Sequence, residues 1–235
     1  MSYEILQQTI PPSFSQGQES LQRVIDKIKG AVALSFSYQA EDVVALHFLS
    51  HCRIKSLEVF TLDTGKLFDE CLALHQQTEE FFKISIKRYL PKADDVKGLE
   101  ERLGDWGMRE SLENRHLCCH IRKVEPLSRA LSGKAAWVTG LRAAQSVTRS
   151  ELKSVEYDEK FNLFKINPLA FWSEDELFSH IKKYNLPLNP LYAQGFKSIG
   201  CRPCTRAVRE DEDIRAGRWW WENPEHKECG LHIKE

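Results

Sequence analysis

Two pairs of cysteines have the residue type and the spacing of metal ligands. Cys118 and Cys119 are adjacent, at a predicted helix start, and Cys201 and Cys204 form a C-x-x-C pair on a predicted loop. Four thiolates are the ligand set of a [4Fe–4S] cluster or of a structural zinc ion. Adjacent side chains diverge on a helix, so they reach one tetrahedral zinc only with strain, whereas a cluster spreads its ligands over a cube. We therefore favour the cluster; the other alternative is two buried cysteines and a separate redox dithiol.

Lys123 and Cys229 are further candidates for chemistry. Lys123 follows Cys119 by four residues, so on a helix both share one face, and its ammonium group would offset the negative charge of a thiolate-ligated cluster. A solvated surface lysine is the alternative on spacing alone. Cys229 is the one cysteine of residues 216–235, a segment without helical or strand periodicity, whose tryptophans at 219–221 are expected to anchor it to the body.

The composition indicates a soluble protein with a sizeable core. Hydrophobic residues make up 42% of the chain, and the formal net charge of -1 argues against a broad nucleic-acid-binding surface, so any anion site must be local. Neither a signal peptide nor a long apolar run is present, which predicts a cytoplasmic protein without a membrane partner. In that reducing compartment the seven cysteines are poorly explained by disulfides.

Alternating apolar and amphipathic segments predict an α/β fold. The predicted strands are 31–36, 56–63, 84–90 and 135–140, and the predicted helices are 17–29, 40–52, 67–83 and 121–133. This alternation is typical of a parallel sheet with helices on its faces. Residues 152–166 then predict a β-hairpin, and 173–185 a helix that begins with a capping box. We divide the chain into an α/β domain, 1–215, and a C-terminal tail, 216–235.

Polar side chains follow three of the predicted strands, where open α/β sheets place ligands. Ser35 and Ser37 precede a helix N-terminus, a position suited to an anion. Residues 62–66 (LDTGK) close the second strand, and residues 140–149 (GLRAAQSVTR) follow the fourth with two arginines, a glutamine and hydroxyls that suit a phosphosulfate. Polar turns, with a positive φ at Gly65, and plain surface charges are the alternatives.

Five segments in order resemble one family. CCHIRKVEPL, VTGLRAAQSVTR, GCRPCT, GRWWWE and the terminal ECGLH are similar to the iron–sulfur assimilatory sulfonucleotide reductases of the adenylyl-sulfate (APS) reductase type, within the 3′-phosphoadenylyl sulfate (PAPS) reductase family. The resemblance runs from about residue 30 to the C-terminus. It implies an adenine nucleotide α-hydrolase-like parallel sheet flanked by helices, a [4Fe–4S] cluster on the four paired cysteines, Cys229 as nucleophile, and thioredoxin or a glutaredoxin-like protein as electron donor.

The resemblance also implies a set of substrate-binding residues. These are Ser35, Ser37, Asp42, Leu62, Asp63, Thr64, Gly65, Lys66, Lys123, Arg142, Gln145, Ser146, Arg149, Arg215, Arg218 and His232. Two departures from the family pattern matter. The family commonly has a glycine soon after the second serine, whereas here Tyr38-Gln39 follows Ser37 and precedes residues 40–42 (AED). Lys66 replaces an arginine, which keeps the charge but loses the bidentate fork.

The implied activity is the reduction of APS to sulfite and AMP, in assimilatory sulfate reduction, through a thiosulfonate on the nucleophilic cysteine. One alternative is reduction of PAPS, or of both nucleotides, because residue types alone do not exclude a further phosphate. Another is an iron–sulfur protein that thiolates tRNA or binds nucleic acid, which the near-neutral charge disfavours. A purely structural zinc module is the third, and the sequence does not decide between a monomer and a homo-oligomer.

Overall fold

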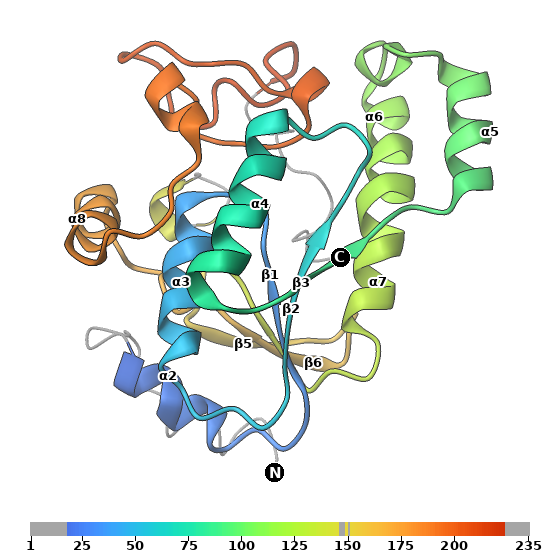
Figure 1. Ribbon diagram of the computed structural model, residues 1–235. Helices are drawn as coiled ribbons and strands as arrows, with labels where there is room; N and C mark the ends of the chain where they lie inside the picture. Colours follow the sequence, from blue (N-terminus) through green and yellow to red (C-terminus); the bar gives the residue numbers. More distant parts are fainter. Residues whose placement is uncertain (1–17, 146–148, 150, 224–235) are drawn as a thin grey trace.

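The fold is a six-stranded sheet covered by helices on both faces (Figure 1). The structure is a computed structural model that describes residues 18–145, 149 and 151–223. The strand order is β3-β2-β1-β4-β6-β5, with every neighbouring pair parallel except the antiparallel edge pair β5 and β6. Leu34 of β1 lies in register with Val59 of β2 and Val138 of β4. The predicted parallel α/β sheet is thus confirmed.

The strands lie where the apolar runs predict them. They are β1 (Val32–Ser35), β2 (Leu57–Leu62), β3 (Ile86–Tyr89), β4 (Ala136–Val138), β5 (Val155–Asp158) and β6 (Leu163–Ile166). The last two form the predicted hairpin. β1 and β4 are buried along most of their length, as expected for central strands of a parallel sheet that is covered on both faces.

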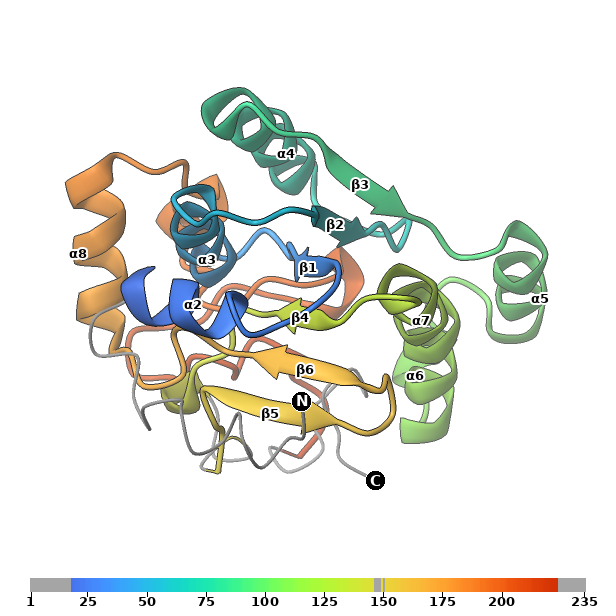
Figure 2. The same ribbon diagram turned by 90° about the horizontal axis from the view of Figure 1, so that it is seen from below.

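Two groups of helices cover the two faces of the sheet (Figure 2). One face carries α2 (Gln18–Ile25), α3 (Ala40–Ser50), α4 (Asp69–Phe82) and α8 (Glu174–Tyr184). On the other side α7 (Glu125–Leu131) packs on the sheet, α6 (Leu112–Cys119) leads into it, and α5 (Ala93–Leu103) lies outside these two helices. The larger core lies under the first group, and a smaller one packs Leu127 and Leu131 of α7 against Phe60 and Trp137 of the sheet. The predicted capping box of α8 is present at Ser173.

The helix that carries the cysteine pair begins earlier than predicted. It starts at Leu112, where the Ser111 hydroxyl accepts a hydrogen bond from the Asn114 amide, and it runs through the π-helical turn η2 (His120–Val124) into α7. The prediction that Cys118 and Cys119 stand at a helix start is therefore wrong, because they end α6. Pro126 has no amide hydrogen for a regular α-helical bond, and the π turn precedes it.

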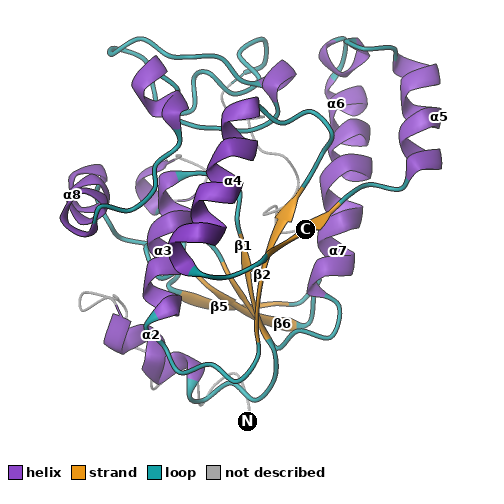
Figure 3. Cartoon of the chain, viewed as in Figure 1, coloured by secondary structure: helices purple, strands orange, loops and turns teal. Residues whose placement is uncertain are grey.

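The loops at the carboxyl ends of the parallel strands gather at one end of the molecule (Figure 3). The chain after α8 passes over this end and contains the short 3-10 turns η5 (Pro190–Gln194) and η6 (Arg202–Cys204). The 3-10 turns η1 (Gly107–Arg109) and η3 (Ala143–Gln145) lie earlier in the chain. In the part of the chain that the structure describes, no helix combines the length and the apolar character needed to cross a membrane.

Candidate active site

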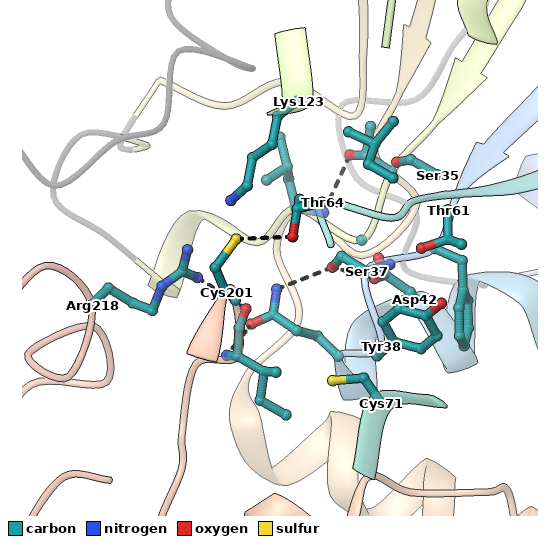
Figure 4. A pocket seen from close by; sticks show the side chains of 18 of the residues that line it. Ser35, Ser37, Tyr38, Asp42, Thr61, Thr64, Cys71, Lys123, Cys201 and Arg218 are labelled. Carbon is teal, nitrogen blue, oxygen red and sulfur yellow. Dashed lines mark hydrogen bonds between the residues drawn. The ribbon is translucent and has the colours of Figure 1, made fainter. Parts of the chain in front are cut away.

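A pocket opens at the carboxyl ends of β1, β2 and β4 (Figure 4). The chain leaves β1 toward β2 on one side and returns to β4 on the other, so the pocket lies at the switch point of the sheet, where such folds bind ligands. Most of the predicted substrate residues line it: Ser35, Ser37, Asp42, Leu62, Thr64, Lys123, Gln145, Arg149, Arg215 and Arg218. Phe36, Leu67 and Leu127 give the same pocket an apolar side.

The loop after β1 is organised by Asp42. One carboxylate oxygen of Asp42 accepts hydrogen bonds from the amide and the hydroxyl of Ser37, each at 2.6 Å. Burial raises the pKa of Asp42 to about 7, against these hydrogen bonds, which favour the charged form. Tyr38 has a φ of 67°, the left-handed region that side chains rarely adopt, and it is buried beside the pocket. A strained backbone conformation of this kind is common in ligand-binding loops.

Gln39 joins this loop to the segment that carries Cys201. Its side-chain oxygen accepts hydrogen bonds from the Ile199 amide at 3.1 Å and from the Ser198 hydroxyl at 3.4 Å, while its nitrogen donates to the Ser37 hydroxyl at 3.4 Å. Gln39 therefore bridges the loop after β1 and the cysteine loop.

The loop after β2 is held by two arginines. Asp63 accepts hydrogen bonds from Arg88 and from the Gly65 amide, and Gly65 has the positive φ, 71°, that its turn requires. The guanidinium group of Arg122 donates to the Thr64 carbonyl at 2.8 Å and to Glu100 at 2.6 Å. Thr64 lines both the pocket and a separate hollow beside α5, whereas Asp63 and Gly65 line that hollow and are not part of the pocket lining.

Arg142 lies outside the pocket lining. Its guanidinium group forms a buried ion pair with Glu41, at 2.8 Å, and donates to the Trp172 carbonyl. Its amide donates to the side-chain oxygen of Gln145, which also accepts from Arg149 at 2.6 Å. In this arrangement Arg142 holds the start of α3 against the loop after β4, and Arg149 is the arginine of this loop that lines the pocket.

The four paired cysteines line one small cavity beside the pocket. Cys118 and Cys119 come from α6, and Cys201 and Cys204 come from the loop that contains η6. The rest of the lining is rich in cations and consists of Lys66, Met108, Arg115, Arg122, Lys123, Pro203 and Trp219. Within residues 18–145, 149 and 151–223, no three His, Cys, Asp or Glu side chains are grouped so that they could hold a single metal ion.

The pKa values of the thiols in this cavity shift in different directions. Burial works to raise the pKa of Cys201, but Lys123, a hydrogen bond shared with the Thr64 hydroxyl at 3.3 Å, and the nearby arginines outweigh it, so the pKa falls below its ordinary value. Burial and the neighbouring Cys201 raise the pKa of Cys118, and they raise that of Cys204 to about 11. The cationic side of the cavity therefore favours negative charge on sulfur next to the pocket.

Lys123, Cys201 and Trp219 each line both the pocket and the cysteine cavity. Figure 4 shows the side chains of Lys123, Cys201 and Arg218 converging at this boundary. Arg218 stacks on the Trp219 ring at 4.6 Å and donates to the Ile199 carbonyl at 2.9 Å, while its buried Nε atom has no hydrogen-bond partner. Gly200 allows this approach, because a Cβ atom there would collide with the guanidinium group.

Three predicted site residues, Cys229, His232 and Ser146, lie outside the residues that the structure describes. Conversely, sequence reasoning missed the roles of two arginines. Arg122 ties the loop after β2 to the cysteine helix, and its place beside Lys123 was the only signal. Arg115 is fully buried, bonds to Glu222 at 2.7 Å and stacks on Trp219, and nothing in the local sequence indicates this.

Comparisons with known proteins agree with this geometry. The sequence profile of the phosphoadenosine phosphosulfate reductase domain matches residues 31–207. The adenosine 5′-phosphosulfate reductase of Allochromatium vinosum is 47% identical over 227 residues, which cover 97% of this chain and 88% of that protein. A crystal structure of phosphoadenylyl-sulfate reductase from Candida auris, in a phosphate complex, has a TM-score of 0.70 at 25% identity and covers 88% of this chain and 98% of that chain.

The FMN adenylyltransferase of Candida glabrata is similar in fold alone. Its structure with FAD and inorganic pyrophosphate has a TM-score of 0.56 at 15% identity and covers 99% of this chain and 78% of that chain. The predicted adenine nucleotide α-hydrolase-like sheet is thereby confirmed. With a domain profile that matches most of its length and a relative at 47% identity, this chain belongs to the phosphoadenosine phosphosulfate reductase family and is an oxidoreductase.

Proposed function

We propose that this chain reduces adenylyl sulfate (APS) to sulfite and AMP in sulfate assimilation, through a thiosulfonate on Cys229, with a thioredoxin-class dithiol protein as electron donor. The observation that carries the proposal is the shared boundary of the two sites: the pocket at the sheet's switch point and the four-cysteine cavity meet at Lys123 and Cys201. The name of the Allochromatium relative favours APS as the nucleotide.

The pocket offers complementary surfaces to the two halves of APS. Its apolar side, with Phe36, Leu67 and Leu127, suits a purine ring, and its cations suit the phosphosulfate. Arg218 is 5% exposed and has a buried donor without a partner, which an anion in the pocket would satisfy. The 3-10 turn at 143–145 leads to Arg149, a further cation at the pocket.

The cysteine cavity fits a [4Fe–4S] cluster by its donor set. A cluster takes one thiolate per iron, so four thiols around one cavity suit it although no three of the described side chains are grouped around a single ion. The lysines and arginines of the lining would offset the negative charge of a thiolate-ligated cluster. When bound, the cluster would supply a fixed anionic centre that orders the loop of Cys201 and orients Lys123 toward the substrate.

The reacting groups are side chains of this chain and the two thiols of the electron donor. The Cys229 thiolate attacks the sulfur of APS, the bond from that sulfur to the bridging oxygen breaks, and AMP leaves with the electron pair. Lys123, Arg149 and Arg218 stabilise the charge that develops on the bridging oxygen and the phosphate. A donor thiolate then attacks the Cys229 sulfur, sulfite leaves, and the second donor thiol resolves the mixed disulfide and restores the Cys229 thiolate.

Intact-protein mass spectrometry tests this mechanism. APS without reductant should add about 80 Da, the mass of SO3, to Cys229, and thioredoxin should remove it as sulfite. Cys229→Ser should still bind AMP and yet form no adduct. An adduct on another cysteine, or normal sulfite release by Cys229→Ser, would contradict the mechanism.

Metal analysis tests the cluster separately. Protein purified without oxygen should be brown and contain about four irons and four sulfides per chain. A serine at any one of the four cavity cysteines should lower the iron content. Stoichiometric zinc without inorganic sulfide would instead identify the structural zinc module.

PAPS is the second candidate substrate, because the Candida auris structure is that of a PAPS reductase and covers most of this chain. PAPS adds one phosphate, which needs a further cation at the ribose end of the pocket. The ratio of kcat/KM for APS and PAPS, measured with the same donor, decides between the two nucleotides.

A further inference from the structure

An exposed tryptophan stands at the rim of a second, open hollow. Trp106 is 56% exposed, the most exposed of the large apolar side chains in the described part of the chain. The hollow runs from Lys66 in the loop after β2, past Asp105 and Trp106, to Arg202 and Pro203 between the two cysteines of the C-x-x-C pair. It therefore borders the cysteine loop at Arg202 and Pro203, and it shares the lining residue Leu67 with the nucleotide pocket.

Arg109 contacts three tryptophan rings and holds them together at this surface. Its guanidinium group lies 4.3 Å from the ring centre of Trp106, 4.7 Å from that of Trp220 and 4.9 Å from that of Trp221. It also donates to the Pro203 carbonyl at 2.5 Å. Tryptophan and arginine are the side chains most enriched at binding hot spots, and ones held by such contacts lose little freedom when a partner binds.

The same surface borders the origin of the C-terminal tail. Trp220 and Trp221 are among the last described residues, and Cys229 follows Asn223 by six positions in the sequence. Six residues span at most about 20 Å. The segment that leads to Cys229 therefore starts next to Trp220 and Trp221, and Cys229 is six residues along the chain from its last described neighbour.

We propose that the surface formed by Trp106, Arg109, Trp220 and Trp221, with the adjoining hollow, docks the dithiol protein that reduces the Cys229 adduct. The inference rests on the proposed function. A protein donor is too large to enter the nucleotide pocket, so it needs a surface outside that pocket and within reach of Cys229, and this one meets both conditions. There a donor thiolate attacks the Cys229 sulfur and sulfite leaves with the electron pair. The second donor thiol then forms the donor disulfide, Cys229 returns as a thiolate, and the two thiol protons pass to solvent.

The test compares a protein donor with a small dithiol on the holoenzyme. Trp106→Ala should raise the KM for thioredoxin at least about 10-fold, the effect of a hot-spot residue. Turnover driven by dithiothreitol, and adduct formation from APS alone, should stay within twofold of the unsubstituted protein. Phe171→Ala is the matched control, because Phe171 is 53% exposed and is not part of the hollow, and it should change neither donor's kinetics.

Each of the other possible results contradicts the proposed docking surface. An unchanged KM for thioredoxin in Trp106→Ala refutes it directly. Equal losses with both donors would assign Trp106 to the integrity of the active site. A dimer in analytical ultracentrifugation that Trp106→Ala dissociates, with thioredoxin kinetics unchanged, would make a second copy of the chain the occupant. If the unsubstituted protein reduces APS with neither donor, the proposed function itself fails, and the docking surface with it.

Discussion

The substitution Gln39→Met should weaken AMP binding and disturb the cysteine loop together. Methionine keeps the length of the side chain but removes the hydrogen bonds by which Gln39 joins Ser37 to Ser198 and Ile199. The Ile199 residue is 2% exposed, so water does not readily replace the acceptor that its amide loses. Cys201 lies two residues further along the same loop.

The expected magnitude follows from that one amide. Leaving a buried donor unsatisfied costs about 1–3 kcal/mol, which corresponds to roughly a 5- to 150-fold change in an equilibrium constant. If the pocket requires the ordered loop in order to bind, the Kd for AMP should rise within that range. The upper end is a limit, because Arg218 still donates to the Ile199 carbonyl and holds part of the loop in place.

Isothermal titration of the holoenzyme with AMP measures this change, and iron content reports the cysteine loop. Gln76→Met is the matched control: Gln76 lies exposed on α4, bonds only within its helix to Glu80, and should leave both quantities unchanged. A Kd within twofold of the unsubstituted protein for Gln39→Met, at unchanged iron content, would refute the idea that Gln39 couples the two sites.

Three further predictions concern the pocket and its boundary. Lys123→Ala should lower kcat by roughly 10²–10³, the effect of removing one electrostatic contact to the transition state, while the protein still assembles its iron. A near-normal kcat would show that Lys123 has a structural role only. The pKa of Asp42 is raised to about 7, so its carboxyl group keeps a proton in the folded protein that the unfolded chain releases from about pH 4 upward. The free energy of unfolding should therefore fall as the pH rises from about 4 to about 7. The melting temperature of Asp42→Asn should lack that decline, and parallel pH profiles would contradict the assignment. Cys71→Ser should keep the iron content, since burial raises the pKa of this pocket thiol to about 11 and it lies outside the cysteine cavity.

The sheet was predictable because its signals are local. Each central strand is an apolar run of a few residues, and the capping box of Ser173 and Glu176 marks the start of α8. The polar residues that follow β1 and β2 could be placed at one edge, since parallel strands bring their carboxyl ends together. These inferences need only periodicity and the handedness of the fold, which the sequence carries within a few residues.

The helix of the cysteine pair and the role of Arg142 were not predictable in this way. The apolar pattern around Pro126 suggested a helix that begins after the cysteines, whereas the helix begins at Leu112 and passes the proline through a π turn. Arg142 faces Glu41, 101 positions away in the sequence. Both residues are polar neighbours of a ligand-binding edge, and only the packing of α3 against the loop after β4 shows that they neutralise each other.

The boundary between the two sites explains why adjacent cysteines suit this position. Cys118 and Cys119 close α6 where the helix enters its π turn, and the same turn carries Arg122 toward the loop after β2 and Lys123 toward the pocket. One helical segment therefore positions the thiols, the cation that faces the pocket and the guanidinium group that holds the Thr64 carbonyl. Because these groups share a backbone, a change that shifts the cysteines should also shift Lys123 at the pocket. Iron content and AMP affinity should accordingly fall together in variants of this segment, whereas substitutions at Trp106 should leave both unchanged.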